Sequence, residues 1–162
     1  MDPEWIWLES TWWPPMAREH FYGVSEQSKA SKHRLADAHA LFNEHRWRGA
    51  MYIAGYAVEC LLKKKLMSMF SCQDLTELEE KLKRRRLLRA GGTIFTHQLE
   101  LLLVLTQSAD RLRQNQPLWR QFNIVNRWIP AWRYTANLSN REDAADFLEA
   151  VTATCRWIEH NI

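Results

Sequence analysis

Residues 50–62 read AMYIAGYAVECLL, and this stretch decides the fold class. Its apolar side chains surround a helix almost completely, and with the residues that follow they predict a helix over about 50–70. Such a helix would be about 31 Å long at about 1.5 Å per residue. A helix without a broad polar face belongs inside a bundle, because each of its sides has to be covered. Its small residues (Ala50, Ala54, Gly55 and Ala57) should let neighbouring helices approach closely. We therefore expect 50–62 to be the buried centre of the fold.

Helical periodicity continues on both sides of this centre. Helices are expected from 28 or 31 to about 45, in a short solvated segment within 71–92, at 96–112, at 117–130, and from a cap at 139 or 140 onward. Pro117 suits the first turn of its helix, and Pro130 should end or kink it. No alternating strand pattern, hairpin turn or internal repeat is visible. The sequence predicts an all-α fold, an antiparallel up-and-down bundle of four to five helices.

The first 27 residues do not follow this pattern and are predicted to form an aromatic N-terminal arm. They carry Trp5, Ile6, Trp7, Trp12, Trp13, Phe21 and Tyr22, interrupted by two prolines. A large aromatic side chain buries about 150–250 Å² when it docks. The arm is therefore expected either to wrap its own bundle or to complete a dimer or grip a partner. The predicted organisation is an arm over 1–27 and a helical bundle over 28–162.

Composition limits the class of protein. The 162 residues are 46% hydrophobic and 25% charged, which is typical of a globular domain. No run approaches the ~18 apolar residues of a membrane span, and no signal segment opens the chain. Three cysteines are too few for a disulfide framework and favour a reducing interior. The expectation is a cytoplasmic, soluble, single-domain protein with no membrane association.

Charge is distributed unevenly behind the net value of +3. Residues 28–133 hold nineteen bases and nine acids, whereas residues 1–27 sum to −4 and residues 134–162 to −3. A middle segment this basic could attract a polyanion such as RNA. Alternatively, the acidic ends fold back over the middle and neutralise it.

Familiar catalytic signatures are missing from the sequence. It has no glycine-rich phosphate loop, no His-Glu-x-x-His, no Cys-x-x-Cys and no Gly-x-Ser-x-Gly. Its six histidines are scattered, and His39 and His45 are too far apart around a helix to share a metal. We therefore predict no metal and no cofactor.

Two polar features could carry a function. Glu59 lies within the apolar central helix, where it should form either an i,i+4 pair with Lys63 or an ion pair with an arginine such as Arg133. The run RWIPAWRY at 127–134 interleaves two arginines with three aromatic residues beside a helix break. Arg127, Arg133, Tyr134 and Lys63 are the predicted RNA- or nucleotide-binding residues, by contact to phosphate and stacking on bases. Alternatively, the tryptophans belong to the core and Arg133 serves Glu59.

These motifs together resemble the HEPN family (the higher eukaryote and prokaryote nucleotide-binding domain). The similar segments are LADAHALF followed by RWRGAMYIAGYAVECLL with Glu59 and Lys63, then THQL at 96–99, then Arg133-Tyr134. The resemblance covers about residues 28–160 and implies an antiparallel helical bundle, usually a homodimer. It also implies a frequent pairing with a minimal nucleotidyltransferase in toxin–antitoxin or defence modules.

The ribonuclease members of that family carry Arg, four to six residues, then His near their last two helices. This sequence departs from that pattern, since no histidine follows Arg127 or Arg133 at the required spacing. The expected function is therefore a non-catalytic, dimeric HEPN-like domain that binds RNA, a nucleotide or a nucleotidyltransferase-type partner. One alternative is a metal-independent ribonuclease toxin using Arg133, Tyr134 and His97. Another is a purely structural interaction module.

Overall fold

The computed structural model describes residues 22–162, and the greater part of the predicted aromatic arm lies outside them. The described chain is all-helical, as predicted, with no β-strand beyond one isolated bridge between Gly23 and Asp74. Its elements are α1 (Val24–Asn43), α2 (Trp47–Met69), α3 (Leu75–Arg84), α4 (Leu99–Leu105), α5 (Ala109–Gln114), α6 (Gln116–Val125), the 3₁₀-helix η1 (Pro130–Tyr134) and α7 (Arg141–Asn161). The all-α helical bundle is confirmed.

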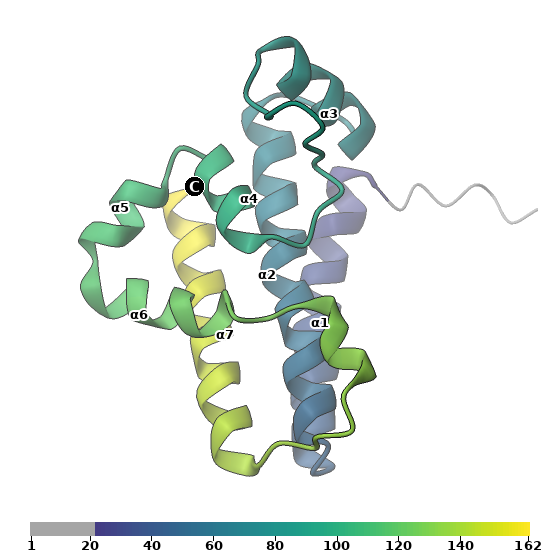
Figure 1. Ribbon diagram of the computed structural model, residues 1–162, viewed down its shortest axis with the longest axis vertical. Helices are drawn as coiled ribbons and strands as arrows, with labels where there is room; N and C mark the ends of the chain where they lie inside the picture. The colour runs from purple at the N-terminus through teal and green to yellow at the C-terminus, as the bar shows by residue number, and fades with distance from the viewer. Residues whose placement is uncertain (1–21) are drawn as a thin grey trace, which may run out of the picture.

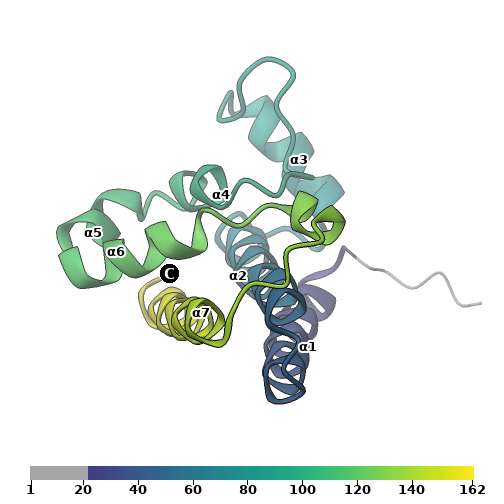
Figure 2. The same ribbon diagram turned by 60° about the horizontal axis from the view of Figure 1, so that its bottom comes forward.

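Three long helices, α1, α2 and α7, run along the length of the molecule (Figure 1). The chain descends in α1, rises in α2, and rises again in α7 after the short helices α4, α5 and α6. Helix α3 caps one end, and the turn from α6 through η1 crosses the face of α2 (Figure 2). The short helices thus take the place of one long descending helix of the expected bundle.

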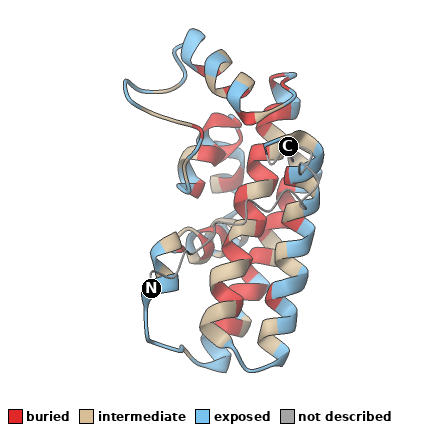
Figure 3. Ribbon diagram, turned by 90° about the vertical axis from the view of Figure 1, so that its right-hand side faces the viewer, coloured by how far each residue is buried: buried red, intermediate tan, exposed pale blue. Residues whose placement is uncertain are grey.

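Helix α2 is the centre of the fold. It packs against α1, α3, α4, α7 and η1. Ala50, Ala54, Ala57, Val58 and Leu62 are fully buried, and red marks much of this helix in Figure 3. The predicted role of 50–62 is confirmed, and its physical cause is the absence of a broad polar face.

Several predicted helix limits are wrong. Helix α1 begins at Val24, about one turn before the expected serine caps, and the continuous helix over 96–112 is two helices. Gln107 interrupts it in the left-handed region at φ 58°, and the Thr106 hydroxyl donates to the carbonyl of Leu103 at 2.6 Å. The helix expected to reach Pro130 ends at Val125.

The predicted start signals of the last helices are correct. Pro117 lies in the first turn of α6, where its missing N–H costs nothing. Asn140 caps α7 by accepting a hydrogen bond from the backbone N–H of Asp143 at 2.8 Å. Within the described residues, no helix is long and apolar enough to cross a lipid bilayer.

Candidate functional site

A polar stripe runs along one side of α2. Tyr52, Tyr56, Glu59 and Lys63 follow one another at spacings of four, three and four residues, which places them on the same face of the helix. The segments that cover this face are the loop before α4, which carries His97, and the turn from Trp128 into η1. The stripe is therefore where three parts of the chain meet.

Glu59 and Lys63 form a buried ion pair at the centre of the stripe. The residues are 5% and 6% exposed, and Nζ of Lys63 donates to Oε1 of Glu59 at 2.7 Å. The second carboxylate oxygen lies 2.7 Å from Nδ1 of His97. Of the two predicted partners for Glu59, the structure therefore gives Lys63. The predicted pair with Arg133 is wrong, because His97 occupies the remaining oxygen.

His97 connects this buried pair to solvent. Its side chain is 49% exposed although Nδ1 is held against Glu59. With Nδ1 as the donor to the carboxylate, Nε2 of the ring is the acceptor and makes no hydrogen bond to any described residue. The geometry therefore orients one ring nitrogen inward and leaves the other available to a ligand.

Aromatic rings fix the outer part of the stripe. The hydroxyls of Tyr52 and Tyr56 lie 3.1 Å apart, and the Tyr56 ring meets the indole of Trp128 edge-on at 4.7 Å between centroids. Trp128 Nε1 donates to the carbonyl oxygen of Tyr52 at 2.9 Å. Burial, the hydrogen bond to Tyr52 and the nearby Glu59 carboxylate all raise the pKa of Tyr56, so this phenol stays protonated. The alternative that the tryptophans of 127–134 belong to the core is confirmed for Trp128, which is buried.

Arg133 and Tyr134 project from η1 at the Tyr52 end of the stripe. The guanidinium of Arg133 lies 4.8 Å from the centroid of the Tyr134 ring. Interactions with the hydroxyls of Tyr134 and Tyr52 raise the pKa of Arg133. Tyr134 is 77% exposed, so this cation–aromatic pair faces solvent.

Arg127 lies apart from these residues. It lines a separate cavity of about 310 Å³ together with Arg48, Trp132, Asp143 and Asp146. Arg48 covers the ring of Trp132 at 4.8 Å and donates to the carbonyl of Asn137. Two aspartates in this cavity balance its two arginines, so it offers a phosphate no excess positive charge. Of the predicted binding residues, Lys63, Arg133 and Tyr134 thus lie along the stripe. The prediction that Lys63 binds a phosphate is wrong, because this side chain is buried and its ammonium is held by Glu59.

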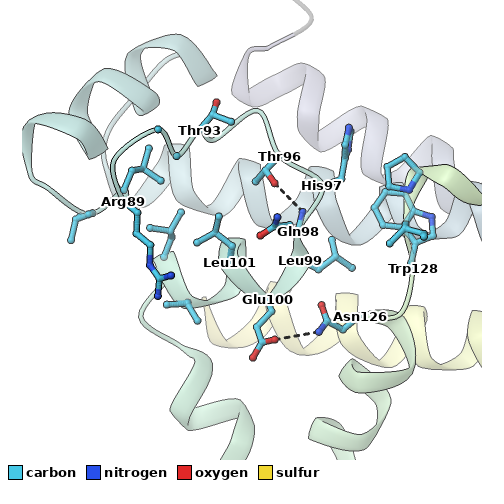
Figure 4. A pocket seen from close by; sticks show the side chains of 18 residues that line it. Arg89, Thr93, Thr96, His97, Gln98, Leu99, Glu100, Leu101, Asn126 and Trp128 are labelled. Carbon is cyan, nitrogen blue, oxygen red and sulfur yellow. Dashed lines mark hydrogen bonds between the residues drawn. The ribbon is translucent and has the colours of Figure 1, made fainter.

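A larger cavity of about 880 Å³ opens beside His97. It lies between the 87–98 loop, α4 and the segment 126–130, and Figure 4 shows Arg89 at one side and His97 and Trp128 at the other. Gln98, Asn126 and two threonines supply uncharged donors and acceptors along its wall. Within residues 22–162, no group of three His, Cys, Asp or Glu side chains could hold a metal ion.

Tyr52 and Tyr56 are the site residues that sequence reasoning missed. Their signal was the four-residue spacing that puts them in register with Glu59 and Lys63 on α2. The sequence matches no protein-family model and no curated protein, and the structure matches no solved structure.

Proposed function

We propose that this chain is a HEPN-like, non-catalytic domain that binds single-stranded RNA. The observation that carries the proposal is the solvent-facing pair of Arg133 and Tyr134 at one end of the stripe that also holds His97. An arginine contacts phosphate, an exposed ring stacks on a base, and a half-exposed imidazole hydrogen-bonds to either. The resemblance noted in the sequence supports the same class of ligand.

A salt titration tests this proposal. Fluorescence anisotropy of a labelled single-stranded RNA should show binding by the full chain that weakens steeply as salt rises, because phosphate contacts release counterions. Arg133→Ala combined with Tyr134→Ala should weaken binding by at least about tenfold, since stacking of one base contributes about 1–3 kcal/mol. Tyr134→Phe keeps the ring and should bind like wild type, and Arg120→Ala controls for the loss of one exposed charge. Absence of binding at low salt would remove the proposal.

A second candidate, a metal-independent ribonuclease, is favoured by the contact between His97 and Glu59. A carboxylate on Nδ1 orients the imidazole and leaves Nε2 to accept a proton. Nε2 would take the proton of a ribose 2′-hydroxyl, and that oxygen would attack the adjacent phosphorus while Arg133 holds the phosphate. The 5′-oxygen leaves and takes a proton from water, which gives a 2′,3′-cyclic phosphate and a 5′-hydroxyl.

His97→Asn distinguishes the two candidates. The asparagine amide can replace Nδ1 as the donor to Glu59 but cannot accept the hydroxyl proton, so the variant should fold and be inactive if the chain is a nuclease. Product analysis in the presence of a chelator should then show cyclic phosphate ends from wild type alone. Intact RNA after incubation with wild type excludes this candidate and leaves binding.

Homodimerisation and a nucleotidyltransferase-type partner in a toxin–antitoxin or defence module complete the proposal, and they rest on the family resemblance. Light scattering on the full chain should give twice the mass of one chain. A monomer at micromolar concentration would count against the dimer. An adjacent gene for a nucleotidyltransferase would support the partner.

A further inference from the structure

Four arginines crowd the end of α3 and the loop that follows it. Arg84, Arg85, Arg86 and Arg89, defined here as the arginine loop, are all exposed. Arg85 lies over the ring of Phe70 at 5.4 Å, and none of the four forms an ion pair with a carboxylate among the described residues. Such a concentration of uncompensated positive charge creates a strong local field for anions.

Hydrogen bonds fix the conformation of the arginine loop. Leu87 N–H donates to the carbonyl of Leu82 at 3.0 Å, and Gly92 N–H donates to the carbonyl of Arg89 at 2.8 Å. Glu79 of α3 anchors the far end of the loop, because its Oε2 accepts from Ile94 N–H at 2.9 Å and from the Thr93 hydroxyl. Hydrogen bonds from Lys83, Thr93 and Ile94 lower the pKa of Glu79, so this carboxylate is engaged by its own anchoring contacts. Glu80, four residues before Arg84 on α3, is exposed and forms no ion pair with the arginines.

The 880 Å³ cavity begins at this loop. Arg89 lines it on one side, and Leu87, Val104 and Ile129 are apolar lining residues that remain 42–51% exposed. Gln98 and Asn126 also line the cavity, and their amides can both donate and accept hydrogen bonds (Figure 4). An unstacked nucleobase can pack its ring face on the apolar side chains and hydrogen-bond its edge to the amides.

Glu100 is the acid among the cavity-lining residues. It already accepts from Arg113 at 3.3 Å and from the Asn126 amide at 3.4 Å. Arg113, which also pairs with Asp110 at 2.9 Å, offsets part of this charge, so the Arg89 side of the cavity is the favoured one for phosphates.

We infer that the arginine loop and the adjoining cavity bind a single strand of RNA, with phosphates on the arginines and bases in the cavity. This inference rests on the proposed function and extends it. The cavity ends at Ile129 and Pro130, and Arg133 follows three residues later on η1. One strand can thus pass from the arginine loop, across His97, to the Arg133–Tyr134 pair. A duplex is disfavoured, because its bases are paired and stacked away from the cavity wall.

Three sets of variants of the full chain test the inference by anisotropy over a range of salt concentrations. Arg84→Ala/Arg86→Ala/Arg89→Ala removes three phosphate contacts. It should reduce the slope of log affinity against log salt by about 2, at about 0.7 per neutralised phosphate on a single strand. Lys32→Ala/Arg120→Ala/Arg156→Ala is the matched control, since it removes three exposed bases that lie outside the cavity and form no ion pair with a described carboxylate. It should leave the slope close to that of wild type.

Gln98→Ala/Ile129→Ala probes the base contacts. It should weaken binding at every salt concentration by about tenfold without changing the slope, because no charge is lost. All substituted side chains are exposed, and thermal melting of each variant checks that the fold is retained.

The outcomes separate this inference from the proposed function. If wild type does not bind RNA, the proposed function fails. If Arg133→Ala/Tyr134→Ala weakens binding but the arginine-loop variant equals its control, the proposed function stands and this inference is overturned. Binding of an acidic protein instead of RNA at the arginine loop also overturns it.

Discussion

Gly55 on α2 faces the indole of Trp128 so closely that no side chain fits between them. A Cβ at this position would lie 2.2 Å from the indole. Gly55→Ala should therefore displace Trp128, break its hydrogen bond to the Tyr52 carbonyl and lower the free energy of unfolding by about 1–3 kcal/mol or more. Urea denaturation measures the change. Gly49→Ala is the control on the same helix: its Cβ would meet Leu41 at an ordinary 3.7 Å, so it should stabilise by up to about 1 kcal/mol.

The Glu59–Lys63 pair is a second residue-scale test. Glu59→Leu leaves the buried Lys63 ammonium without its partner and should cost about 3–5 kcal/mol. Glu59→Leu/Lys63→Leu removes both charges and should be more stable than Glu59→Leu alone. A double-mutant cycle from chemical denaturation gives the coupling. Additive single effects would show that the two side chains do not act as a pair.

Burial sets the reactivity of the cysteines. It raises the pKa of Cys60 to about 11 and that of Cys155 to about 12, from an ordinary 9.0, and also raises the pKa of Cys72. Native protein should therefore react slowly with Ellman's reagent at pH 8, and all three thiols should react readily only when the chain is unfolded. Below about pH 9 these thiols are protonated in both the folded and the unfolded chain. As pH rises toward 11–12, the unfolded chain loses thiol protons before the folded chain does, so the free energy of unfolding falls. The urea midpoint should fall between pH 8 and pH 11, and fall less in Cys155→Ala.

At the scale of elements, left-handed residues end several helices without a glycine. His45, Ser71, Arg86 and Gln107 have φ between 53° and 59°. After α2, Cys72 N–H donates to the Met67 carbonyl at 2.8 Å and Ser71 N–H to the Ser68 carbonyl, which is the Schellman arrangement. Ser71→Gly should stabilise the protein by about 1 kcal/mol, since glycine adopts this conformation freely. Ser68→Gly, three residues earlier and helical, should destabilise it by about 0.5 kcal/mol. Thermal melting measures both changes in stability, and a change in the same direction in the two variants would contradict the interpretation.

These helix ends explain how much of the fold was predictable. An almost all-round apolar surface located α2, apolar periodicity located α7, and Asn140 and Pro117 marked helix starts, because caps act through neighbouring residues. The break at Gln107 was not predictable, since a glutamine in the left-handed region leaves no sequence signal. Likewise Lys63 was visible as a partner for Glu59 at i,i+4, whereas His97, 38 residues away, was brought there only by the packing of the loop before α4.

At the scale of the molecule, no ion pair of the described chain joins its basic middle segment to its acidic C-terminal one. Every ion pair among residues 22–162 joins side chains within residues 26–113, and none reaches the segment 134–162. Lys65 does contact Glu159, but through the backbone carbonyl at 2.9 Å. Asp143 and Asp146 do share a cavity with Arg48 and Arg127 and offset their charge there, whereas no acid of this segment forms an ion pair with the arginine loop, whose positive field remains for a polyanion.

The acidic N-terminal residues give the last prediction. Deleting residues 2–21 removes one base and four acids and raises the formal net charge from +3 to +6. It also spares Val24 and Gln27, which pack into the fold, so the cut belongs at 21 and not at the predicted boundary of 27. If the basic surface attracts RNA, the truncated chain should bind more tightly at low salt, and the difference should vanish above about 0.5 M salt, where the Debye length falls to a few ångströms. Anisotropy with both chains measures this, and light scattering on the same samples reports whether the tryptophan-rich residues hold an oligomer together. Weaker RNA binding by the truncated chain at all salt concentrations would mean instead that those tryptophans contact the RNA.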